Sequence, residues 1–347
     1  MSAEAAVGID PERLVDPQAR VIDYLRVSVT DRCNYGCVYC IPGDGVEHTE
    51  RADVLSFEEI AALVRVFATL GVRRVRLTGG EPTVRRDLVA LVRLLRAVPG
   101  IDDIALSTNG HRLPELAAPL REAGVDRLNI SVDSLDAERF RQITRRGDLA
   151  RVLAGIDAAR AAGFSSIKLN TVAIRGGNDD EFARICDWAW ERGLVPRFIE
   201  EMPMADGRAY QAGAQVAAAE IRDRIAAGWP GTHVVADDPD RSRGAGPARY
   251  FRLEGGDAAD VRRFGIISPM TEHFCTTCNR LRLSTSGALH ACLAYDDAVD
   301  LRGPLHAGGD DAVARAIRGA LAGKRPGHTF QLIGLGGPRK AMVQIGG

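Results

Sequence analysis

Three cysteines within a short stretch constrain this chain more than any other feature of its sequence. Cys33, Cys37 and Cys40 have the spacing Cys-x3-Cys-x2-Cys, which lets three thiolates converge on one inorganic cluster. A four-iron cluster ordinarily takes four cysteine ligands. Three cysteines would therefore leave one iron open to a small chelating molecule. A zinc site is the alternative, but it needs a fourth ligand, and the nearest candidate, His48, stands at no standard spacing.

Length, composition and charge narrow the class of protein. A chain of 347 residues with 46% hydrophobic and 26% charged residues fits a soluble βα barrel with a small addition. The net charge of -1 indicates neither a nucleic acid nor an anionic membrane as partner. No segment approaches the roughly 20 apolar residues that span a bilayer, and the first residues do not resemble a secretory signal. Seven cysteines, six of them in two tight clusters, indicate metal sites in a reducing cytoplasm rather than disulfides.

Strand and helix patterns alternate through the first part of the chain. Strands are expected over 24–30, 73–78, 104–108, 127–132, 166–172 and 195–199. Helices are expected after Ser56 and over 87–97, 114–123, 149–162 and 179–192. This order predicts parallel strands joined by right-handed crossovers. We therefore expect an α/β fold, an incomplete (βα)6 TIM-type barrel over 23–235, after an N-terminal tail of residues 1–22 and before a C-terminal cluster-binding region, 236–347.

A second group of cysteines stands in that C-terminal region. Cys275, Cys278 and Cys292 again number three, and His273 and His290 nearby would complete a Cys3His zinc site. From spacing alone, zinc and iron remain equally open. The run Asn279-Arg-Leu-Arg282 places two guanidinium groups beside the metal, and arginine forks suit phosphate oxygens. A purely structural metal site does not need them, so the run favours a ligand-binding site.

Other candidate residues lie on the expected strands. Gly79 and Gly80 end the second strand, where a ligand could approach the backbone closely. Arg26, Arg76 and Lys168 fall on the first, second and fifth strands. Charges inside a barrel are costly unless they are paired, so these side chains favour an anionic ligand, and a solvated face is the alternative.

Together these motifs resemble those of known enzymes. The first cysteine motif with Tyr39 is similar to that of the radical S-adenosylmethionine superfamily. With Leu77-Thr-Gly-Gly-Glu-Pro82, the Cys275 run and the terminal Gly346-Gly347, the chain resembles the GTP 3′,8-cyclase family of molybdenum cofactor biosynthesis from about residue 24 onward.

The resemblance implies a fold, a reaction and a set of cofactors. The fold would be an incomplete barrel with two 4Fe-4S clusters, the first carrying S-adenosylmethionine and the second binding GTP through its guanine. A 5′-deoxyadenosyl radical would take hydrogen from the ribose 3′ carbon, and GTP would become 3′,8-cyclo-7,8-dihydro-GTP. The implied partners are a reducing electron donor, a downstream cyclic pyranopterin monophosphate synthase and a second copy of the chain in a homodimer.

The resemblance also implies roles for particular residues. The cluster ligands would be Cys33, Cys37, Cys40, Cys275, Cys278 and Cys292. Contacts to S-adenosylmethionine would come from Tyr39, Gly80, Ser131 and Met202. Contacts to GTP would come from Arg26, Arg76, Ser107, Lys168, Arg280, Leu281 and Arg282, with Arg280 and Arg282 as the catalytic residues. The terminal Gly346-Gly347 would enter the active site.

Two other functions remain open. A radical S-adenosylmethionine enzyme that modifies peptides could carry the same auxiliary cysteines, but it has no need for paired arginines after Cys278. A zinc or iron-sulfur module without catalysis is the second alternative. Metal content distinguishes them, because two cubane clusters hold about eight irons per chain.

Overall fold

The computed structural model of this chain describes residues 13–210, 213, 215–237, 246–255 and 262–346. The helices are α1 (Phe57–Thr69), α2 (Leu88–Arg96), α3 (Leu113–Ala123), α4 (Ala137–Thr144), α5 (Leu149–Ala161), α6 (Phe182–Trp190), α7 (Ala218–Ala227), α8 (Arg302–Ala322) and α9 (Met342–Ile345). The strands are β1 (Tyr24–Ser28), β2 (Arg74–Thr78), β3 (Asp103–Thr108), β4 (Arg127–Ser131), β5 (Ile167–Ala173), β6 (Val195–Glu200), β7 (Thr232–Ala236), β8 (Arg249–Gly255), β9 (Arg263–Ile267), β10 (Arg280–Leu283), β11 (Ala288–His290) and β12 (Val299–Asp300). Short 3-10 helices are η1 (Arg51–Asp53), η2 (Pro82–Val84) and η3 (Cys275–Thr277).

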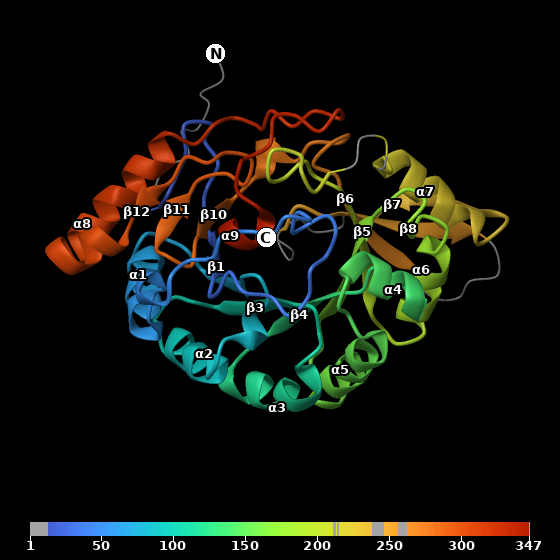
Figure 1. Cartoon of the computed structure of the whole chain (residues 1–347), viewed down its shortest axis with the longest axis horizontal. Helices are drawn as coiled ribbons and strands as arrows, with labels where there is room; N and C mark the ends of the chain where they lie inside the picture. Colours follow the sequence, from blue (N-terminus) through green and yellow to red (C-terminus); the bar gives the residue numbers. More distant parts are fainter. Residues whose placement is uncertain (1–12, 211–212, 214, 238–245, 256–261, 347) are drawn as a thin grey trace, which may run out of the picture.

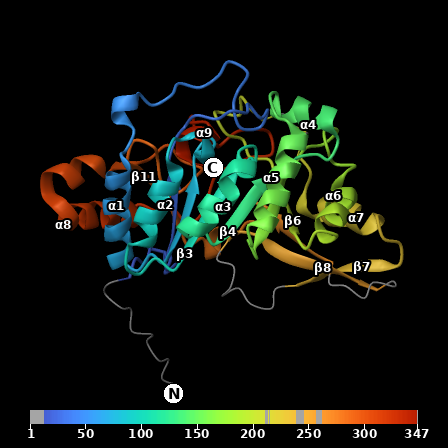
Figure 2. The ribbon, with the colours of Figure 1, turned by 90° about the horizontal axis from the view of Figure 1, so that it is seen from below.

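The first six strands form the parallel core of the sheet. Strands β1 to β6 pair side by side in chain order, each parallel to the next. Helices α1, α2, α3 and α5 curve around the outside of these strands (Figure 1), and the view from below shows them side by side along one flank (Figure 2). The expected incomplete (βα)6 barrel is therefore confirmed.

Strands from the C-terminal region extend this sheet on both sides. Strand β10 pairs parallel to β1, and β9 pairs parallel to β6. Antiparallel strands follow at each end, β11 and β12 beyond β10, and β8 and β7 beyond β9. Within the described residues the strand order is open, running from β12 to β7 without a pairing that closes it. The expected boundary at residues 235 and 236 thus lies within one continuous sheet and stays a prediction.

Side chains on the parallel strands alternate between two environments. On β5, the odd-numbered side chains, such as Leu169 and Thr171, are buried on the helix-covered side. Asn170 and Val172 instead line a cavity on the inner side. On the neighbouring strands the same alternation turns charged side chains such as Arg26 inward, because successive side chains of a strand point to opposite faces. The barrel interior therefore carries charged and polar groups beside apolar ones, which is unusual unless a ligand occupies it.

Part of the segment that was expected to be an N-terminal tail packs against the barrel. Residues 1–12 lie outside the described residues, whereas 13–22 pack against the barrel. The side chains of Leu14 and Ile22 are buried, and Val15 pairs with Val21 in an isolated bridge. Residues 13–22 are thus part of the folded core, because they contribute apolar side chains to it.

Helix α1 begins as its sequence predicts. The Ser56 side chain accepts a hydrogen bond from the Glu59 backbone nitrogen at 3.1 Å. The Glu59 carboxylate in turn accepts one from the Ser56 backbone nitrogen at 2.6 Å. This capping box satisfies two backbone donors that a helix N-terminus otherwise leaves unpaired. Helix α8 packs beside α1, as both views show. Among the helices that the structure describes, none combines the length and apolar character needed to cross a bilayer.

Candidate active site

A cavity of about 330 Å³ opens at the carboxyl ends of the parallel strands. Both cysteine triads line it, Cys33, Cys37 and Cys40 from one side and Cys275, Cys278 and Cys292 from the other. Most of the other expected site residues line it as well, namely Arg26, Tyr39, Arg76, Gly80, Ser107, Ser131, Met202, Arg280 and Arg282. The fold therefore brings together two motifs that lie more than two hundred residues apart in the sequence.

The first triad lies in the loop that follows β1. The Cys33 sulfur accepts a hydrogen bond from the Tyr35 backbone nitrogen at 3.3 Å. Burial raises the pKa of Cys33 to about 11 and that of Cys40 to about 12. These thiols are therefore protonated in the free protein, and a bound metal would displace their protons.

The donor set of this loop suits an iron-sulfur cluster. As they stand in the described part of the chain, no three Cys, His, Asp or Glu side chains are already gathered around one metal position, so a bound metal would draw its ligands together. A cubane cluster needs its thiolates at separate corners, which three cysteines spread along one cavity wall can supply. His48, the alternative fourth zinc ligand, instead lies 3.6 Å from an Asp31 carboxylate oxygen.

The glycine turn after β2 lies directly against the cysteine loop. The Gly80 nitrogen donates to the Thr30 carbonyl at 2.7 Å, and the Glu81 nitrogen donates to the Arg32 carbonyl at 2.9 Å. A Cβ atom on Gly80 would lie 2.4 Å from the Arg32 carbonyl oxygen. Glycine is therefore required here for the turn and the loop to approach one another.

The end of β4 contributes polar groups that face the cavity. Tyr39 donates its hydroxyl to Asp133 at 2.7 Å, which joins the cysteine loop to this strand end. Burial raises the pKa of Asp133 to about 6. Sequence reasoning selected Ser131 but not Asp133, Asn129 or Asn170, which line the same cavity. The signal was present, since Asn129-Ile-Ser131-Val-Asp133 alternates polar and apolar residues.

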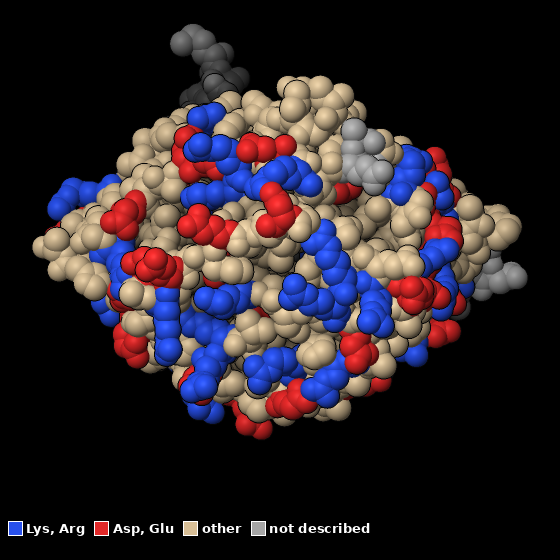
Figure 3. Space-filling model, viewed as in Figure 1, with Lys and Arg blue, Asp and Glu red and all other residues tan. Residues whose placement is uncertain are grey.

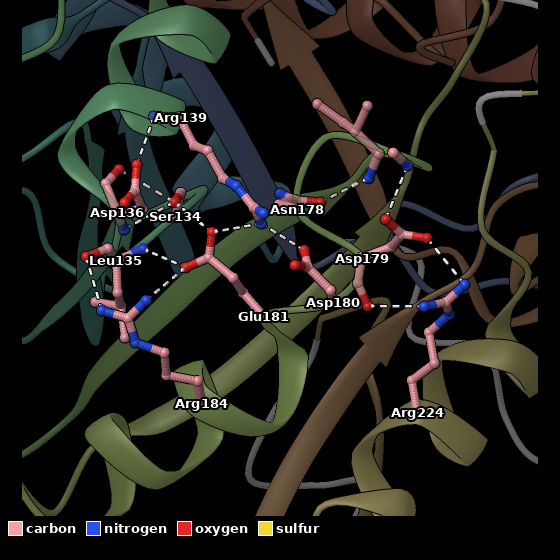
Figure 4. Close-up of polar contacts among 12 residues, drawn as sticks. Ser134, Leu135, Asp136, Arg139, Asn178, Asp179, Asp180, Glu181, Arg184 and Arg224 are labelled. Atoms are coloured by element: carbon pink, nitrogen blue, oxygen red, sulfur yellow. Dashed lines mark hydrogen bonds and ion pairs between the residues drawn. The ribbon is translucent and has the colours of Figure 1, made fainter.

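The loop after β4 is braced by a buried carboxylate at the N-terminal end of α6 (Figure 4). Glu181 accepts hydrogen bonds from the Ser134 hydroxyl at 2.6 Å and from the Leu135 nitrogen at 3.0 Å. Asn178 donates to the Asp133 carbonyl at 2.7 Å. These buried bonds fix the strand end, so its cavity-facing side chains are held in place before any ligand binds.

Arginine side chains form the floor and one wall of the cavity. Arg282, Arg26 and Arg76 are register partners on the adjacent strands β10, β1 and β2. Burial, followed by repulsion from Arg282, lowers the pKa of Arg26 well below its ordinary value. Burial, followed by repulsion from Arg280, lowers the pKa of Arg282 to about 10. Such a group of buried cations is costly without an anion among them.

A further arginine was missed by the sequence reasoning. Arg197 on β6 lines the cavity and donates from its Nε to the Asn170 side chain at 3.0 Å. Its position on an expected strand, flanked by apolar residues, was the signal that could have found it. Elsewhere, Lys and Arg are interspersed with Asp and Glu over the face drawn in Figure 3. On this face the charges of both signs are mixed, in contrast to the arginines gathered along the cavity.

Two of the expected substrate contacts do not line the cavity. The Lys168 ammonium lies 5.9 Å from the centre of the Tyr250 ring, and Lys168 is not among the described residues that line the cavity. The Leu281 side chain is fully buried in the main hydrophobic core, because it points to the opposite face of β10 from Arg280 and Arg282. Ser107, by contrast, lies at the cavity and accepts a hydrogen bond from Arg76 at 3.3 Å.

The second triad carries a more acidic thiol than the first. Burial raises the pKa of Cys278, but the charges of Arg280 and Lys324 outweigh burial and lower it to about 6. Arg280 lies 3.6 Å from the Cys278 sulfur. Of the candidate zinc ligands, His273 faces His328, and His290 is fully buried opposite Arg282. The three cysteines of this triad thus face the cavity with arginine beside them, and His328 lines the same cavity.

The C-terminal segment enters the cavity. The Gly346 carbonyl accepts hydrogen bonds from Arg282 at 2.6 Å and from Arg26 at 3.4 Å. Gly346 has a φ of 81°, and a Cβ atom there would lie 3.0 Å from the Ser28 Cβ. Gly347 lies outside the described residues. The expected approach of the chain end to the site is therefore seen at Gly346.

Comparison with known proteins agrees with this geometry. Residues 27–189 match the radical SAM superfamily model, and residues 195–330 match the model named Molybdenum Cofactor Synthesis C. The chain is 48% identical to the GTP 3′,8-cyclase of Pelotomaculum thermopropionicum over 333 residues, which cover 96% of this chain and 99% of that protein. It is 46% identical to the GTP 3′,8-cyclase of Moorella thermoacetica over 336 residues, with coverages of 96% and 99%. A barrel with two cysteine triads on one arginine-lined cavity, together with this similarity along the chain, places the protein in the GTP 3′,8-cyclase family of radical SAM enzymes.

Proposed function

We propose that this protein converts GTP to 3′,8-cyclo-7,8-dihydro-GTP, the first step of molybdopterin biosynthesis. The relatives named GTP 3′,8-cyclase support this reaction, since their similarity spans nearly the whole chain. The observation that carries the proposal is the shared cavity, which presents both cysteine triads and a group of arginines to one bound molecule. Those arginines suit the phosphate oxygens of a triphosphate. The near-neutral net charge of the whole chain does not by itself indicate such an anionic ligand.

The first triad would hold one 4Fe-4S cluster through Cys33, Cys37 and Cys40, with S-adenosylmethionine at the iron that lacks a cysteine. When bound and given one electron by a reductant, this pair would supply methionine and a 5′-deoxyadenosyl radical that could take hydrogen from the ribose 3′ carbon. Gly80 would present its backbone to the methionyl group. Tyr39, Ser131 and Met202 would complete the contacts of the cofactor, and their positions around the same cavity support this assignment. The apolar core behind them would exclude water from a reactive primary radical.

GTP would lie between the two triads. Arg26, Arg76, Arg280 and Arg282 would bind the triphosphate through their planar forks, and Ser107 would add a hydroxyl. Arg282 and Arg26 donate to the Gly346 carbonyl, so phosphate groups that bound these arginines would compete with the C-terminal segment for them. Lys168 would act as a further cation on β5, and Leu281 would act only by packing β10 against the core, so that Arg280 and Arg282 face the cavity.

The second triad would hold another 4Fe-4S cluster through Cys275, Cys278 and Cys292, with the guanine of GTP at its open iron. The acidic thiol of Cys278 supports metal binding, because less free energy is needed to remove its proton. Further partners follow from the reaction: a low-potential electron donor, and a cyclic pyranopterin monophosphate synthase that consumes the product. We also propose a homodimer in the cytoplasm, where these oxygen-sensitive clusters persist.

Turnover with isotopically labelled GTP tests this function. The anaerobically reconstituted chain, given S-adenosylmethionine, a reductant and GTP deuterated at the ribose 3′ carbon, is expected to form 5′-deoxyadenosine that carries deuterium. GTP deuterated at the 2′ carbon serves as the control and should transfer none. Deuterium-free 5′-deoxyadenosine from the 3′-labelled substrate would show that this carbon is not the site of hydrogen abstraction.

A further inference from the structure

Two buried cations outside the arginine-lined cavity bracket the second cysteine triad. Arg20 comes from the N-terminal segment, and Lys324 lies just after helix α8 near the other end of the chain. Their exposed fractions are 7% and 4%. Lys and Arg side chains are almost never this buried unless they are paired, so both positions require a structural or chemical reason.

Lys324 joins the segments that carry two of the three cysteines. Its ammonium donates to the Arg280 carbonyl at 3.1 Å and also to the Ala291 carbonyl. It lies 4.0 Å from the Cys278 sulfur. Since Arg280 follows Cys278 by two residues and Ala291 directly precedes Cys292, one side chain fixes the separation of these two thiols.

Arg20 performs the corresponding task for the third cysteine. Its guanidinium donates to the Cys275 carbonyl at 2.7 Å and to the Arg325 and Pro326 carbonyls at 2.8 and 3.2 Å. The buried carboxylate of Asp16 pairs with it and holds it in place. The loop that carries Cys275 is thereby attached to the residues that follow Lys324.

The two cations differ in how their charge is balanced. Arg20 is neutralised by Asp16, whereas in the described part of the chain no carboxylate pairs with Lys324. The Lys324 ammonium lies 4.0 Å from the Cys278 sulfur, so it places a buried positive charge directly beside a thiolate that would hold a metal.

We propose that Lys324 and Arg20 are positioning residues for the second triad. Arg20 places Cys275, and Lys324 sets the distance between Cys278 and Cys292 and supplies the positive charge that their thiolates require. The proposal deepens the proposed function, since it rests on the second triad as a metal site. Neither residue touches the substrate cavity, so both act through the cysteines.

Cobalt binding to the isolated second triad tests this role without enzymatic activity. A full-length chain with Cys33, Cys37 and Cys40 changed to alanine leaves one triad, and the thiolate-to-cobalt absorption of added Co²⁺ reports its affinity. In that background, Lys324→Met should weaken cobalt binding by about 10–100-fold, the usual effect of removing a partner of a metal ligand. Lys324→Arg, which keeps the charge and the donors, should recover most of the loss.

The neighbouring residue supplies a matched control. Arg325 carries the same charge, but its side chain is half-exposed and pairs with Asp297. Arg325→Met should leave the cobalt affinity unchanged. Arg20→Met should weaken cobalt binding in the manner of Lys324→Met, and thermal unfolding of each variant shows whether the chain remains folded.

A second measurement separates a chemical role from a merely structural one. After iron-sulfur reconstitution of the same background, Lys324→Met should shift the reduction potential of the cluster to more negative values, because a positive charge near the cluster favours the added electron. Unchanged cobalt affinity in a folded Lys324→Met chain would overturn the proposal, as would an unchanged reduction potential.

The proposed function can fail separately. The unmodified triad could bind cobalt with the predicted dependence on Lys324 and yet assemble no iron-sulfur cluster. In that case the proposal of a second cluster is wrong, and the positioning role of Lys324 stands. If the unmodified triad binds neither cobalt nor an iron-sulfur cluster, both are overturned. If it assembles a cluster without binding cobalt, the reduction potential of the Lys324→Met cluster decides the positioning role.

Discussion

Arg280 lies at the boundary between the second triad and the cavity, 3.6 Å from the Cys278 sulfur. A lysine there keeps the charge but loses the planar fork that binds two phosphate oxygens at once. Arg280→Lys is therefore expected to raise the dissociation constant for GTP about tenfold, with S-adenosylmethionine binding unchanged. Calorimetric titration of each ligand into the anaerobic protein measures both.

Arg65 provides the control for that substitution. It lies on α1, is half-exposed and pairs with Asp310. Arg65→Lys should leave GTP binding as it is. An unchanged GTP affinity in Arg280→Lys would remove Arg280 from the phosphate contacts.

Glu201, just after β6, is a buried carboxyl group in the cavity wall, and its Oε2 has no hydrogen-bond partner among the described residues. Burial raises its pKa from 4.5 to about 7. The unfolded chain therefore loses this proton at lower pH than the folded chain does. The stability that the protonated group contributes is present below pH 4.5 and is lost as the pH rises to about 7.

Glu201→Gln removes this titration. Relative to the unmodified protein, the free energy of unfolding of the variant should rise by about 1–3 kcal/mol between pH 4.5 and pH 7 and stay constant above it. Urea unfolding of the metal-free chains at several pH values gives the difference. A difference that does not change with pH would show that Glu201 ionises normally.

At the scale of single elements, β10 combines two functions in four residues. Arg280 and Arg282 face the cavity, and Leu281 between them packs in the core. The sequence reasoning grouped Leu281 with the substrate contacts because it stands within the motif. Strand alternation explains the difference, since a residue between two inward side chains points outward.

Leu281→Ala separates these functions. Removing a fully buried leucine side chain is expected to lower the free energy of unfolding by about 2–5 kcal/mol. The dissociation constant for GTP should stay within about twofold. Denaturant unfolding and GTP titration measure the two quantities, and a loss of GTP affinity without a loss of stability would restore the side chain to the substrate contacts.

The elements that were predicted correctly have strong local signals. The six barrel strands follow from period-two alternation, and α1 follows from its capping box and its regularly spaced apolar residues. Strands β9 and β10 were missed because they are only 5 and 4 residues long and are stabilised by distant partners. The pairing of Arg26 with Arg282 joins residues far apart in the sequence, which no local pattern reports.

The same distinction holds for the candidate site. Cysteine spacing identified both triads, and inward arginines identified most of the cavity floor. The assignment of Lys168 to the substrate stays a prediction, because alternation fixes only the face of a strand and not the position along it. Arg20 and Lys324 carried no signal, because their significance depends on contacts between the two ends of the chain.

At the scale of the whole molecule, the fold arranges two separate metal motifs around one chamber. The barrel supplies the first triad after β1, and the strands that flank it supply the second. The N-terminal segment and the residues after α8 meet at the second triad. The N-terminal segment and the segment after α8 thus both help to build the site. The sheet likewise contains strands from the regions that the two family models match.

Iron content after anaerobic reconstitution tests this arrangement most directly. The unmodified chain should hold about eight irons, and alanine substitution of either cysteine triad should leave about four. About four irons in the unmodified chain, unchanged when Cys275, Cys278 and Cys292 are replaced, would contradict a second cluster on this cavity.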